Sequence, residues 1–596
     1  MAKIVAKQLP GHRELIYYYQ HSYRVKIHPG AEGKGPGSGP SQVKTESVYL
    51  GTADQVRDRC RAGFAPQKVQ AKAFGWVMTV LHMIDSLGLV DAVNQYVPKR
   101  QQGLSPGVYI ALGVLAQLCA PDKSWRSFGP WLQKTVVPEH WALPAHLLDA
   151  QNFWDHWDLL CPEATMPQTT DDAPILDTDT VFQVEEAVWE TVQDRYQLRL
   201  DDVLYDATNC FTFFQPHTPA SVAQTGHNKA GRHDHRQIGL ALAATRQDGL
   251  PLLSLVYQGN CHDAKLFPES MTRLIDRITQ LNRGTHHLVV ICDRGNNSQK
   301  NFQDLILSSA SDPAAAGERL RVDVIGGLVA SQHRDLLQKP LTAYAETHGT
   351  LKVWHGKRVV YGLPATVVMT YHAGLAQKQR QSFDRQVQQA GDRLRAYGSQ
   401  RTRGSLEARQ ARLESLRKTL RGGRYWTVTV EDSGQLVLRA NRAARTLRYR
   451  EHGKRLLFTT DLTLTVPEIL DAYNHDKSRV EDDFRTLKAA DLIRIQPIRH
   501  GTDSKIRVYA LICVMALLVL KLLGRTARDA GLTMSPTVLK TELEDIQQIY
   551  LEMSTTTIQR VLTTQSTIQQ QLFTVFDLNR YAPQNSAAVP LHLANG

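Results

Sequence analysis

A short apolar run, His287–Asp293 (HLVVICD), constrains the fold more than any other feature of the sequence. Its length suits a β-strand, and its continuous apolar character predicts a strand that is buried on both faces. A strand of this kind lies inside a sheet that helices cover, so the run predicts an α/β core. Its last residue, Asp293, is a carboxylate at the end of a core strand, where burial is unfavourable unless something compensates the charge.

The residues before this run predict the rest of the same core. Strands are expected over Val203–Thr208, Gln237–Thr245 and Leu252–Tyr257, the last two joined by a turn at Asp248-Gly249. A helix follows, because Met271, Leu274, Ile275, Ile278 and Leu281 share one face. The predicted order is strand, strand, strand, helix, strand. Further strands are expected over Arg321–Ile325, in parts of 349–360, over Trp426–Val430 and over 454–460.

Charge and composition narrow the class of protein. The 596 residues suggest several structural units, and 42% hydrophobic residues argue against global disorder. The formal net charge of +12 indicates an anionic partner, of which nucleic acid is the commonest, although a merely basic soluble enzyme fits equally well. In residues 377–424 there are 13 Lys or Arg against 4 Asp or Glu, a net +9. This predicted helical stretch is either a solvated hairpin or a surface for the DNA backbone.

Cysteine usage and hydropathy bear on the compartment. The seven cysteines are scattered without a CxxC pair, which argues against a zinc ribbon or a disulfide framework and favours a reducing cytoplasm. The N-terminus has no apolar run like that of a signal peptide. The most apolar run, Val508–Leu520, is too short to span a bilayer unaided and predicts a buried helix. We therefore expect a cytoplasmic protein with no membrane partner.

Three acids stand out by position. Asp206 follows the strand-forming residues Val203, Leu204 and Tyr205, and Asp293 ends the apolar run. A bound cation would compensate such carboxylates, and Mg²⁺ takes oxygen ligands of this kind. Either residue alone also fits a strand-end or capping role.

The third acid, Glu481, comes from a predicted helix over 473–488 (YNHDKSRVEDDFRTLK). The spacing of Tyr473, Lys477, Glu481 and Lys488 keeps these four side chains on one flank of that helix. One carboxylate would complete a metal site there, and the cations suit phosphates. The alternative is a charged surface helix with ordinary i,i+4 pairs.

An ordered series of segments resembles the DDE transposases of bacterial insertion sequences, in the insertion-sequence-four branch with its Tyr-Arg-Glu-Lys signature. Besides the helix at 473–488, the matching segments are YDATN around Asp206, GHNKAGRHDHRQIGLAL (226–242), DGLPL (248–252), YQGNCHDAKLF (257–267), CDRGNNSQKN (292–301), RIQPIRH (494–500) and KIRVYALICVMALL (505–518). Each segment is weak alone, but they occur in the order of the family.

The resemblance implies an RNase H-like α/β catalytic core in which Asp206, Asp293 and Glu481 bind two Mg²⁺ ions, with Mn²⁺ a possible substitute. It places Tyr473 and Lys488 near the scissile DNA end. Lys477 occupies the Arg position of the signature, and Lys cannot form the bidentate fork to phosphate that Arg forms. Tyr473 is also one residue further from that position than is usual. These departures put the phosphate contacts in doubt, but not the metal triad.

The activity that the resemblance implies is cutting of one strand by a metal-activated water and attack of the freed 3′-hydroxyl on DNA. Its partners would be double-stranded DNA, both the terminal inverted repeats and the target, and a second copy of the chain. Relatives often flip a base onto an aromatic residue, for which Trp354 and Trp426 are candidates. For each of them, a place in the core of a β domain is the simpler interpretation.

The expected organisation is a flexible segment at 1–60, a helical DNA-binding domain at 61–195, the core at 196–305 and 454–528, a β-rich insertion with a basic helical stretch at 306–453, and a helical C-terminal region with a tail at 529–596. The polar cluster of His227, His233, His235 and His262 matches no standard zinc spacing and is expected in a loop near DNA. Cys210 and Cys292 lack a paired histidine signature for nucleophilic catalysis. Three functions remain open: an active transposase, a related nuclease that does not join DNA, and a silent DNA-binding descendant.

Overall fold

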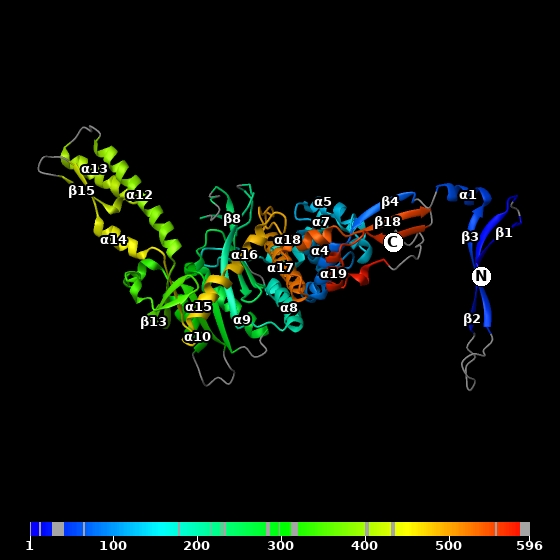
Figure 1. Ribbon diagram of the computed structural model, residues 1–596, viewed down its shortest axis with the longest axis horizontal. Helices are drawn as coiled ribbons and strands as arrows, with labels where there is room; N and C mark the ends of the chain where they lie inside the picture. The colour runs from blue at the N-terminus through cyan, green and yellow to red at the C-terminus, as the bar shows by residue number, and fades with distance from the viewer. Residues whose placement is uncertain are drawn as a thin grey trace. The chain divides into compact units, whose positions relative to one another are not determined.

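The computed structural model describes residues 2–10, 13–26, 41–62, 66–176, 179–215, 217–227, 231, 234–281, 286–296, 298–310, 320–399, 405–430, 436–554 and 557–583 (Figure 1). The chain folds as two compact units. Unit 1 comprises Met1–Gly75, Lys134–Ala142 and Glu544–Gly596, and unit 2 comprises Trp76–Gln133 and Leu143–Leu543. The candidate site lies in unit 2.

A large mixed sheet forms the centre of unit 2. Its strands lie in the order β12-β13-β14-β17-β11-β10-β6-β8-β9-β5, with β7 paired to β8. They are β5 (Ile175–Leu176), β6 (Asp202–Phe211), β7 (Gln224–Thr225), β8 (Arg236–Thr245), β9 (Pro251–Gln258), β10 (His287–Cys292), β11 (Arg321–Gly327), β12 (Glu346–His348), β13 (Leu351–Val360), β14 (Leu363–Tyr371) and β17 (Lys454–Thr459).

Five of these strands form the part of the sheet that the sequence predicted best. Strands β6, β8 and β9 pair antiparallel, whereas β10 runs parallel to β6 and β11 runs parallel to β10. Helix α9 (Asp263–Leu281) connects β9 to β10, and α10 (Gln299–Ala310) connects β10 to β11. Residues Leu288 to Cys292 of β10 are all buried, as their apolar character predicted. The predicted order of elements and the α/β class are therefore confirmed.

The segment predicted as a β-rich insertion differs from expectation in two ways. First, β11 lies inside the predicted range 306–453, yet it pairs with β10 as a strand of the central sheet. Second, a helix that was not predicted, α14 (Arg442–Glu451), follows the hairpin of β15 (Trp426–Val430) and β16 (Leu436–Ala440). The polar stretch at 377–424 was predicted to be helical, and it forms most of α12 (Ala373–Ser399) and all of α13 (Leu406–Thr419). Strand β17 pairs with both β11 and β14, so the insertion extends the core sheet.

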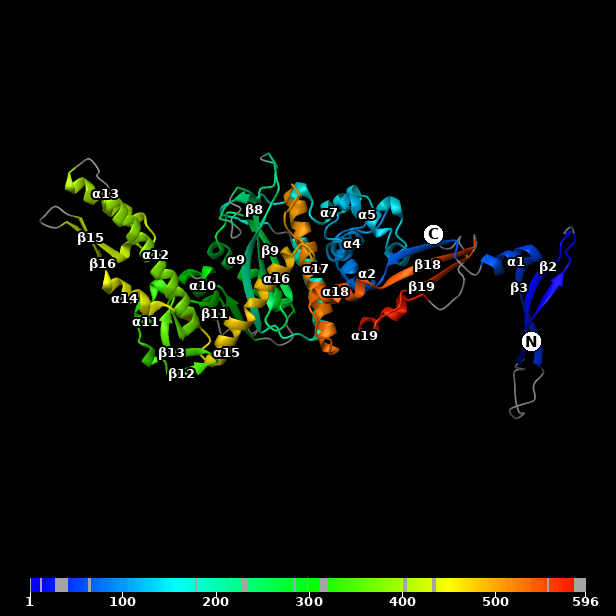
Figure 2. The ribbon, with the colours of Figure 1, turned by 45° about the horizontal axis from the view of Figure 1, so that its top comes forward.

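One long helical segment follows β17 and returns across the sheet. It consists of α15 (Val466–Asp471), a π-helical turn η7 (Ala472–Asp476) and α16 (Ser478–Lys488). The sequence predicted a single regular helix here, and the π turn interrupts it beside Tyr473. Helix α16 contacts β6 and β8 (Figure 2). The segment therefore lies against β6, which bears Asp206 at its middle, and against β8 and β11.

Helices cover the rest of unit 2. They are α2 (Gly75–Ser86), α3 (Leu89–Tyr96), α4 (Pro106–Cys119), α5 (Trp125–Leu132), α7 (Ala150–Leu160), α8 (Asp179–Tyr196), α17 (Asp503–Asp529) and α18 (Pro536–Glu544). Ser105 and Pro106 are the N-cap and first residue of α4, as predicted. Helix α17 packs against α4, α7 and β9 (Figure 2).

Two helical features of unit 2 meet a length and composition test for crossing a membrane. One is α17, and the other is the bent pair α2 and α3 taken together. The apolar window of α17 is 94% buried inside the protein. This burial agrees with the predicted core helix around Val508–Leu520.

Unit 1 contains more strand than the sequence suggested. Strands β1 (Ala2–Lys7), β2 (Ile16–Lys26) and β3 (Ser41–Thr52) form one antiparallel sheet, followed by α1 (Ala53–Ala62), where a flexible segment was predicted. Strands β4 (Lys68–Ala73), β18 (Gln547–Ser554) and β19 (Thr557–Leu562) form a second sheet, and α19 (Thr567–Val575) follows it. The region at 529–596, which was predicted to be helical, therefore also contains the strands β18 and β19. Strands β1, β3 and β4 are mostly exposed and lack a strong apolar alternation, which is why their pattern was missed. Most of the GKGPGSGPS stretch lies outside the described residues.

Candidate active site

Asp206 and Asp293 lie at matching positions on two adjacent strands. In the parallel pair of β6 and β10, Tyr205 is opposite Cys292. The next residue of each chain is the aspartate. Tyr205 and Cys292 are 1% and 0% exposed, and the following side chains point to the opposite face because strand residues alternate. The fold thus brings the two predicted aspartates to one face and one level of the sheet.

Asp293 is held as an anion. Its Oδ1 accepts hydrogen bonds from the Arg294 backbone N–H at 2.9 Å and from the Tyr473 hydroxyl at 3.1 Å. Partial burial opposes the charged form, but the Lys477 ammonium and these two hydrogen bonds outweigh it and lower the pKa of Asp293 below its usual value. The carboxylate is therefore ionised at neutral pH and able to take a cation.

Lys477 lies between Asp293 and Glu481. The lysine is only 5% exposed, and its Nζ is 3.4 Å from Oε1 of Glu481. The same ammonium acts electrostatically on Asp293. The side chain of Glu481 is 55% exposed, so this carboxylate remains accessible from solvent. The one buried positive charge of Lys477 therefore acts on both Glu481 of the helix and Asp293 at the end of β10.

Lys488 reaches β6 on the side of Asp206. Its Nζ donates to Oγ1 of Thr208 at 2.6 Å. Thr208 is two residues beyond Asp206 and shares its face of the strand. Tyr473 and Lys477 therefore lie at Asp293, and Lys488 lies at the strand of Asp206. The structure brings three of the four residues predicted on one helix flank to the strands that bear the two aspartates, and Glu481 lies against Lys477.

Ion pairs on both sides hold this helical segment in place. Arg246 lies between Asp476 of the π turn, at 2.7 Å, and Asp202 of β6, at 2.9 Å. On α16, the fully buried Asp483 pairs with Lys521 of α17. Burial raises the pKa of Asp483 to about 6, and Lys521 offsets part of that rise.

Gly327, at the end of β11, provides the space for Tyr473. A Cβ at this glycine would lie 2.5 Å from the Tyr473 hydroxyl, closer than any normal contact. The absence of a side chain at Gly327 therefore allows the tyrosine to reach Asp293.

The donor set suits hard divalent cations. Asp206, Asp293 and Glu481 offer only carboxylate oxygens, which Mg²⁺ and Mn²⁺ favour. Among the described residues, these three acids do not form a group whose ligand atoms all lie within 4.8 Å of one another. A single ion would need a closer set, whereas two ions about 4 Å apart could connect more widely spaced carboxylates. The residues present are therefore of the type that Mg²⁺ takes, although the three acids do not converge on a single point in this structure.

The two candidate tryptophans differ in accessibility. Trp426 is 9% exposed, belongs to a hydrophobic cluster of the insertion, and donates from Nε1 to the Val387 carbonyl at 2.8 Å. It is a core residue, so its predicted role in stacking on a base does not fit the structure. Trp354 on β13 is half-buried, with the Lys339 ammonium 4.8 Å from its ring centroid. Only Trp354 retains an accessible ring.

The histidine cluster and the cysteines do not add to the site. His227 and His262 are exposed, His235 pairs with Asp234 at 3.5 Å, and His233 lies outside the described residues. Burial raises the pKa of Cys210 to about 11 and that of Cys292 to about 12. Both thiols are therefore protonated at neutral pH, which disfavours a nucleophilic role.

Sequence reasoning missed three residues that shape this site. Thr208 lies within the YDATN segment, but the sequence analysis gave it no role. Gly327 ends β11, two residues beyond the strand predicted at Arg321–Ile325, and a glycine at a strand end was the available signal. Arg294 follows Asp293 directly and contributes its backbone N–H.

No protein-family model matches the chain, and no curated protein sequence matches it. Among solved structures, the fold is similar to a piggyBac transposase determined by cryo-EM as a synaptic complex with hairpin DNA. The TM-score is 0.34 at 9% identity, over 89% of this chain and 87% of that chain. A TM-score of this size does not establish a shared fold, so the function rests on the side chains described above.

Proposed function

We propose that the protein is a DDE transposase that cuts DNA at the ends of its mobile element and joins those ends to new DNA. One observation carries the proposal. The helical segment that bears Glu481 contacts the strands of both aspartates through Tyr473 and Lys488. We infer from these contacts that the three acids, which come from distant parts of the sequence, face one region of the sheet beside two cations suited to phosphate.

The connectivity of the central strands supports an RNase H-like core. Three antiparallel strands, β6, β8 and β9, are followed by a helix and then by β10 and β11, which add in parallel beside β6. The first aspartate lies on the first strand and the second follows the fourth strand. Glu481 comes from a helix that packs on the same sheet after the insertion.

In this proposal Asp206, Asp293 and Glu481 hold two Mg²⁺ ions, for which Mn²⁺ can substitute. When bound, the ions would activate the attacking oxygen and stabilise the leaving oxygen of a phosphodiester. Tyr473 and the Arg294 N–H keep Asp293 anionic and orient its Oδ1. Lys477 and Lys488 offer point charges to the phosphates of a bound DNA end.

The branch and the partners belong to the same proposal. Tyr473, Lys477, Glu481 and Lys488 support the insertion-sequence-four branch, with lysine in the place of the signature arginine. The partners would be double-stranded DNA at the terminal repeats and the target, bridged by a homodimer. The basic stretch at 377–424 forms α12 and α13, whose residues are largely exposed, and it would contact the DNA backbone.

Two other functions share this geometry. A related metal-dependent nuclease would use the same three acids but release its products without joining them. A silent descendant would bind DNA without cutting it. The intact set of acids and the anionic state of Asp293 favour an active enzyme over the silent descendant.

Cleavage of a plasmid that carries the DNA flanking the gene, with Mg²⁺, tests the proposal. Wild type is compared with Glu481→Gln and with Asp482→Asn, a control on the same helix whose side chain is 50% exposed and pairs with Arg485. We expect wild type and Asp482→Asn to cut at the element boundary and to join the ends to a second plasmid. Glu481→Gln should lose both steps.

The outcomes separate the three functions. Cutting without joining indicates the nuclease. DNA binding without cutting by any variant indicates the silent descendant. Equal cutting by wild type and Glu481→Gln would remove Glu481 from the site and contradict the proposal.

A further inference from the structure

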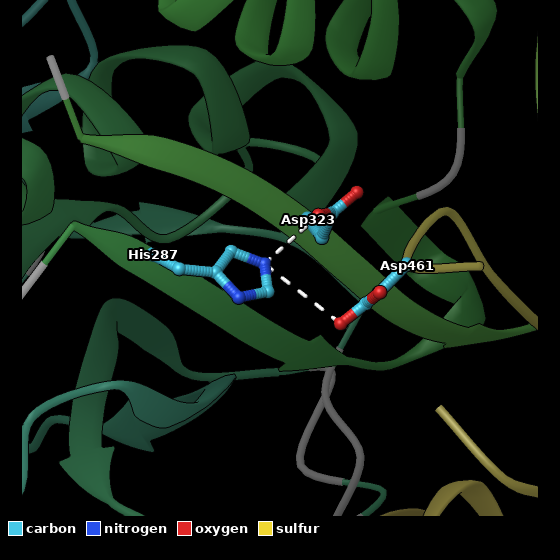
Figure 3. Close-up of side chains that lie close together, drawn as sticks. All are labelled: His287, Asp323 and Asp461. Atoms are coloured by element: carbon cyan, nitrogen blue, oxygen red, sulfur yellow. Dashed lines mark hydrogen bonds and ion pairs between the residues drawn. The ribbon is translucent and has the colours of Figure 1, made fainter. Parts of the chain in front are cut away.

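A second cluster of ligand-type side chains lies away from the three acids. His287 is the first residue of β10, Asp323 lies in β11, and Asp461 follows β17 (Figure 3). One ring nitrogen and one oxygen from each carboxylate all lie within 4.8 Å of one another. Within the part of the chain that the structure describes, no other three His, Cys, Asp or Glu residues meet this spacing.

We propose that His287, Asp323 and Asp461 bind one divalent transition-metal ion, of the class of Zn²⁺, Co²⁺ or Mn²⁺. One imidazole and two carboxylates form a mixed nitrogen and oxygen donor set. Imidazole suits transition ions, whereas Mg²⁺ prefers oxygen ligands alone. The ligand type therefore distinguishes this site from the all-carboxylate site at Asp206, Asp293 and Glu481.

Hydrogen bonds aim one oxygen of each aspartate at the imidazole. Thr460 donates from its hydroxyl to Oδ1 of Asp323 at 2.7 Å, and Thr463 donates from its N–H and hydroxyl to Oδ1 of Asp461 at 2.9 and 2.6 Å. The Oδ2 atoms of Asp323 and Asp461 lie 2.9 and 3.9 Å from Nε2 of His287. Donors that occupy the far oxygen of a carboxylate orient it as a metal ligand.

The charges of the cluster favour an added cation. The side chains of Asp323 and Asp461 are only 5% and 3% exposed. Arg321 contacts Oδ2 of Asp323 at 2.6 Å and lies 3.7 Å from Asp461. Arg321 thus supplies one positive charge against two buried carboxylates, and a bound cation would supply further compensation.

A path for the ion exists on the solvent side. Arg321 is 56% exposed, so its guanidinium can turn into solvent and leave Oδ2 of Asp323 to the ion. His287 is 35% exposed, so its ring is accessible from outside. Arg321 is therefore a competitor of the ion rather than a ligand.

The position of the cluster assigns it a structural role. His287 and Asp293 are six residues apart on one extended segment, about 20 Å at 3.3 Å per residue. Asp461 begins the connection from β17 to α15, the first part of the segment that carries Tyr473 and Glu481. A bound ion would fix the start of that segment to the first halves of β10 and β11. The inference does not depend on the proposed DNA activity.

Titration with Co²⁺ alone, without DNA, tests the proposal through the visible absorption of the bound ion. The background is Asp293→Asn with Glu481→Gln, which removes two of the three carboxylates of the candidate active site and leaves Asp206. We expect one equivalent of Co²⁺ to bind. Each ligand is then replaced in turn, by Asp461→Asn, Asp323→Asn or His287→Gln. Each substitution should weaken Co²⁺ binding at least about 10-fold, which is the size of effect seen even when a residue that only orients a metal ligand is lost. His286→Gln, at the neighbouring exposed histidine, should bind as the background does.

Arg321→Met separates a metal site from an ion-pair cluster. If the site binds metal, removal of the competing guanidinium should tighten Co²⁺ binding and raise the thermal unfolding temperature on addition of Co²⁺. If the cluster is only an ion-pair network, Arg321→Met should bind no Co²⁺. The proposal is overturned by a background protein that binds no Co²⁺, or by equal affinity in the background and in a folded His287→Gln variant.

Discussion

The Tyr473 hydroxyl donates a hydrogen bond of 3.1 Å to Oδ1 of Asp293, although the two residues are 180 positions apart in the sequence. This bond joins the helical segment after the insertion to the last residue of a core strand before it. The tyrosine is largely buried, and burial and the neighbouring carboxylate raise its pKa, so it remains a donor at neutral pH. The site therefore depends on a contact that only the completed fold provides.

Replacement of this tyrosine by phenylalanine should impair the chemistry more than the fold. A hydrogen bond to a charged group contributes about 1.5–3 kcal/mol, so Tyr473→Phe should cut DNA about 10- to 100-fold more slowly. Without the donor the pKa of Asp293 rises, and the acid side of the pH–rate profile should move to higher pH. Tyr397→Phe on α12 is the control. An unchanged profile in Tyr473→Phe would show that the contact does not tune Asp293.

The substitution Gly327→Ala should disturb the same hydrogen bond between Tyr473 and Asp293, because it adds a methyl group beside the Tyr473 hydroxyl. The added Cβ would lie 2.5 Å from the Tyr473 hydroxyl, so the ring must move away from Asp293. Gly327→Ala should therefore reproduce the kinetic defect of Tyr473→Phe. The double variant should be no slower than the more impaired single variant, because both changes remove one interaction. Additive losses in a cleavage assay would contradict this relation.

The buried Asp483 predicts a specific pH dependence of stability. Its pKa is raised to about 6 in the folded protein from an ordinary value of 3.8. Between these values the folded state keeps a proton that the unfolded state has lost, so the free energy of unfolding falls as pH rises through this window and then levels off. Asp483→Asn should remove about 1–3 kcal/mol of that fall. Urea unfolding at about pH 4 and about pH 7 measures it, with Asp482→Asn as control.

Removal of the buried tryptophan should destabilise the insertion without a direct effect on chemistry. Trp426 packs in the cluster of α12, α13 and the β15–β16 hairpin, and its ring lies where a Cβ at Gly391 would be 2.4 Å away. Trp426→Ala should cost roughly 3–5 kcal/mol. Trp354→Ala should reduce the free energy of unfolding much less, because the Trp354 ring is only half-buried. If this variant binds DNA more weakly, the loss would indicate that a base stacks on the Trp354 ring. Limited proteolysis and DNA-binding titrations distinguish the two.

The core was predictable because its strands carry strong local patterns. The run at His287–Cys292 is apolar throughout and is buried throughout, and the strands β6, β8 and β9 appear within a few residues of their predicted limits. The spacing of Tyr473, Lys477, Glu481 and Lys488 on a helix likewise predicted a shared flank, and three of these residues reach the site.

Other features could not be predicted because they depend on pairing between distant segments. The β11–β17 pairing joins Ile325 to Thr459 across the whole insertion. His287, Asp323 and Asp461 stand in three separate elements, and no spacing in the sequence connects them. The π turn at Ala472–Asp476 has no residue signature of its own, since proline and glycine are absent from it.

The pairing of β14 with β17 has a consequence for protein engineering. Tyr371, the last residue of β14, is the register partner of Lys454, the first residue of β17. The ends of the intervening 82-residue excursion, 372–453, therefore meet at a single antiparallel pair. A two-residue type I′ loop connects the two strands of such a pair. Residues 372–453, which include α12–α14, could therefore be replaced by such a loop while β17 still pairs with the edge of β11. A cut made earlier, directly after β11, would expose that edge and invite aggregation.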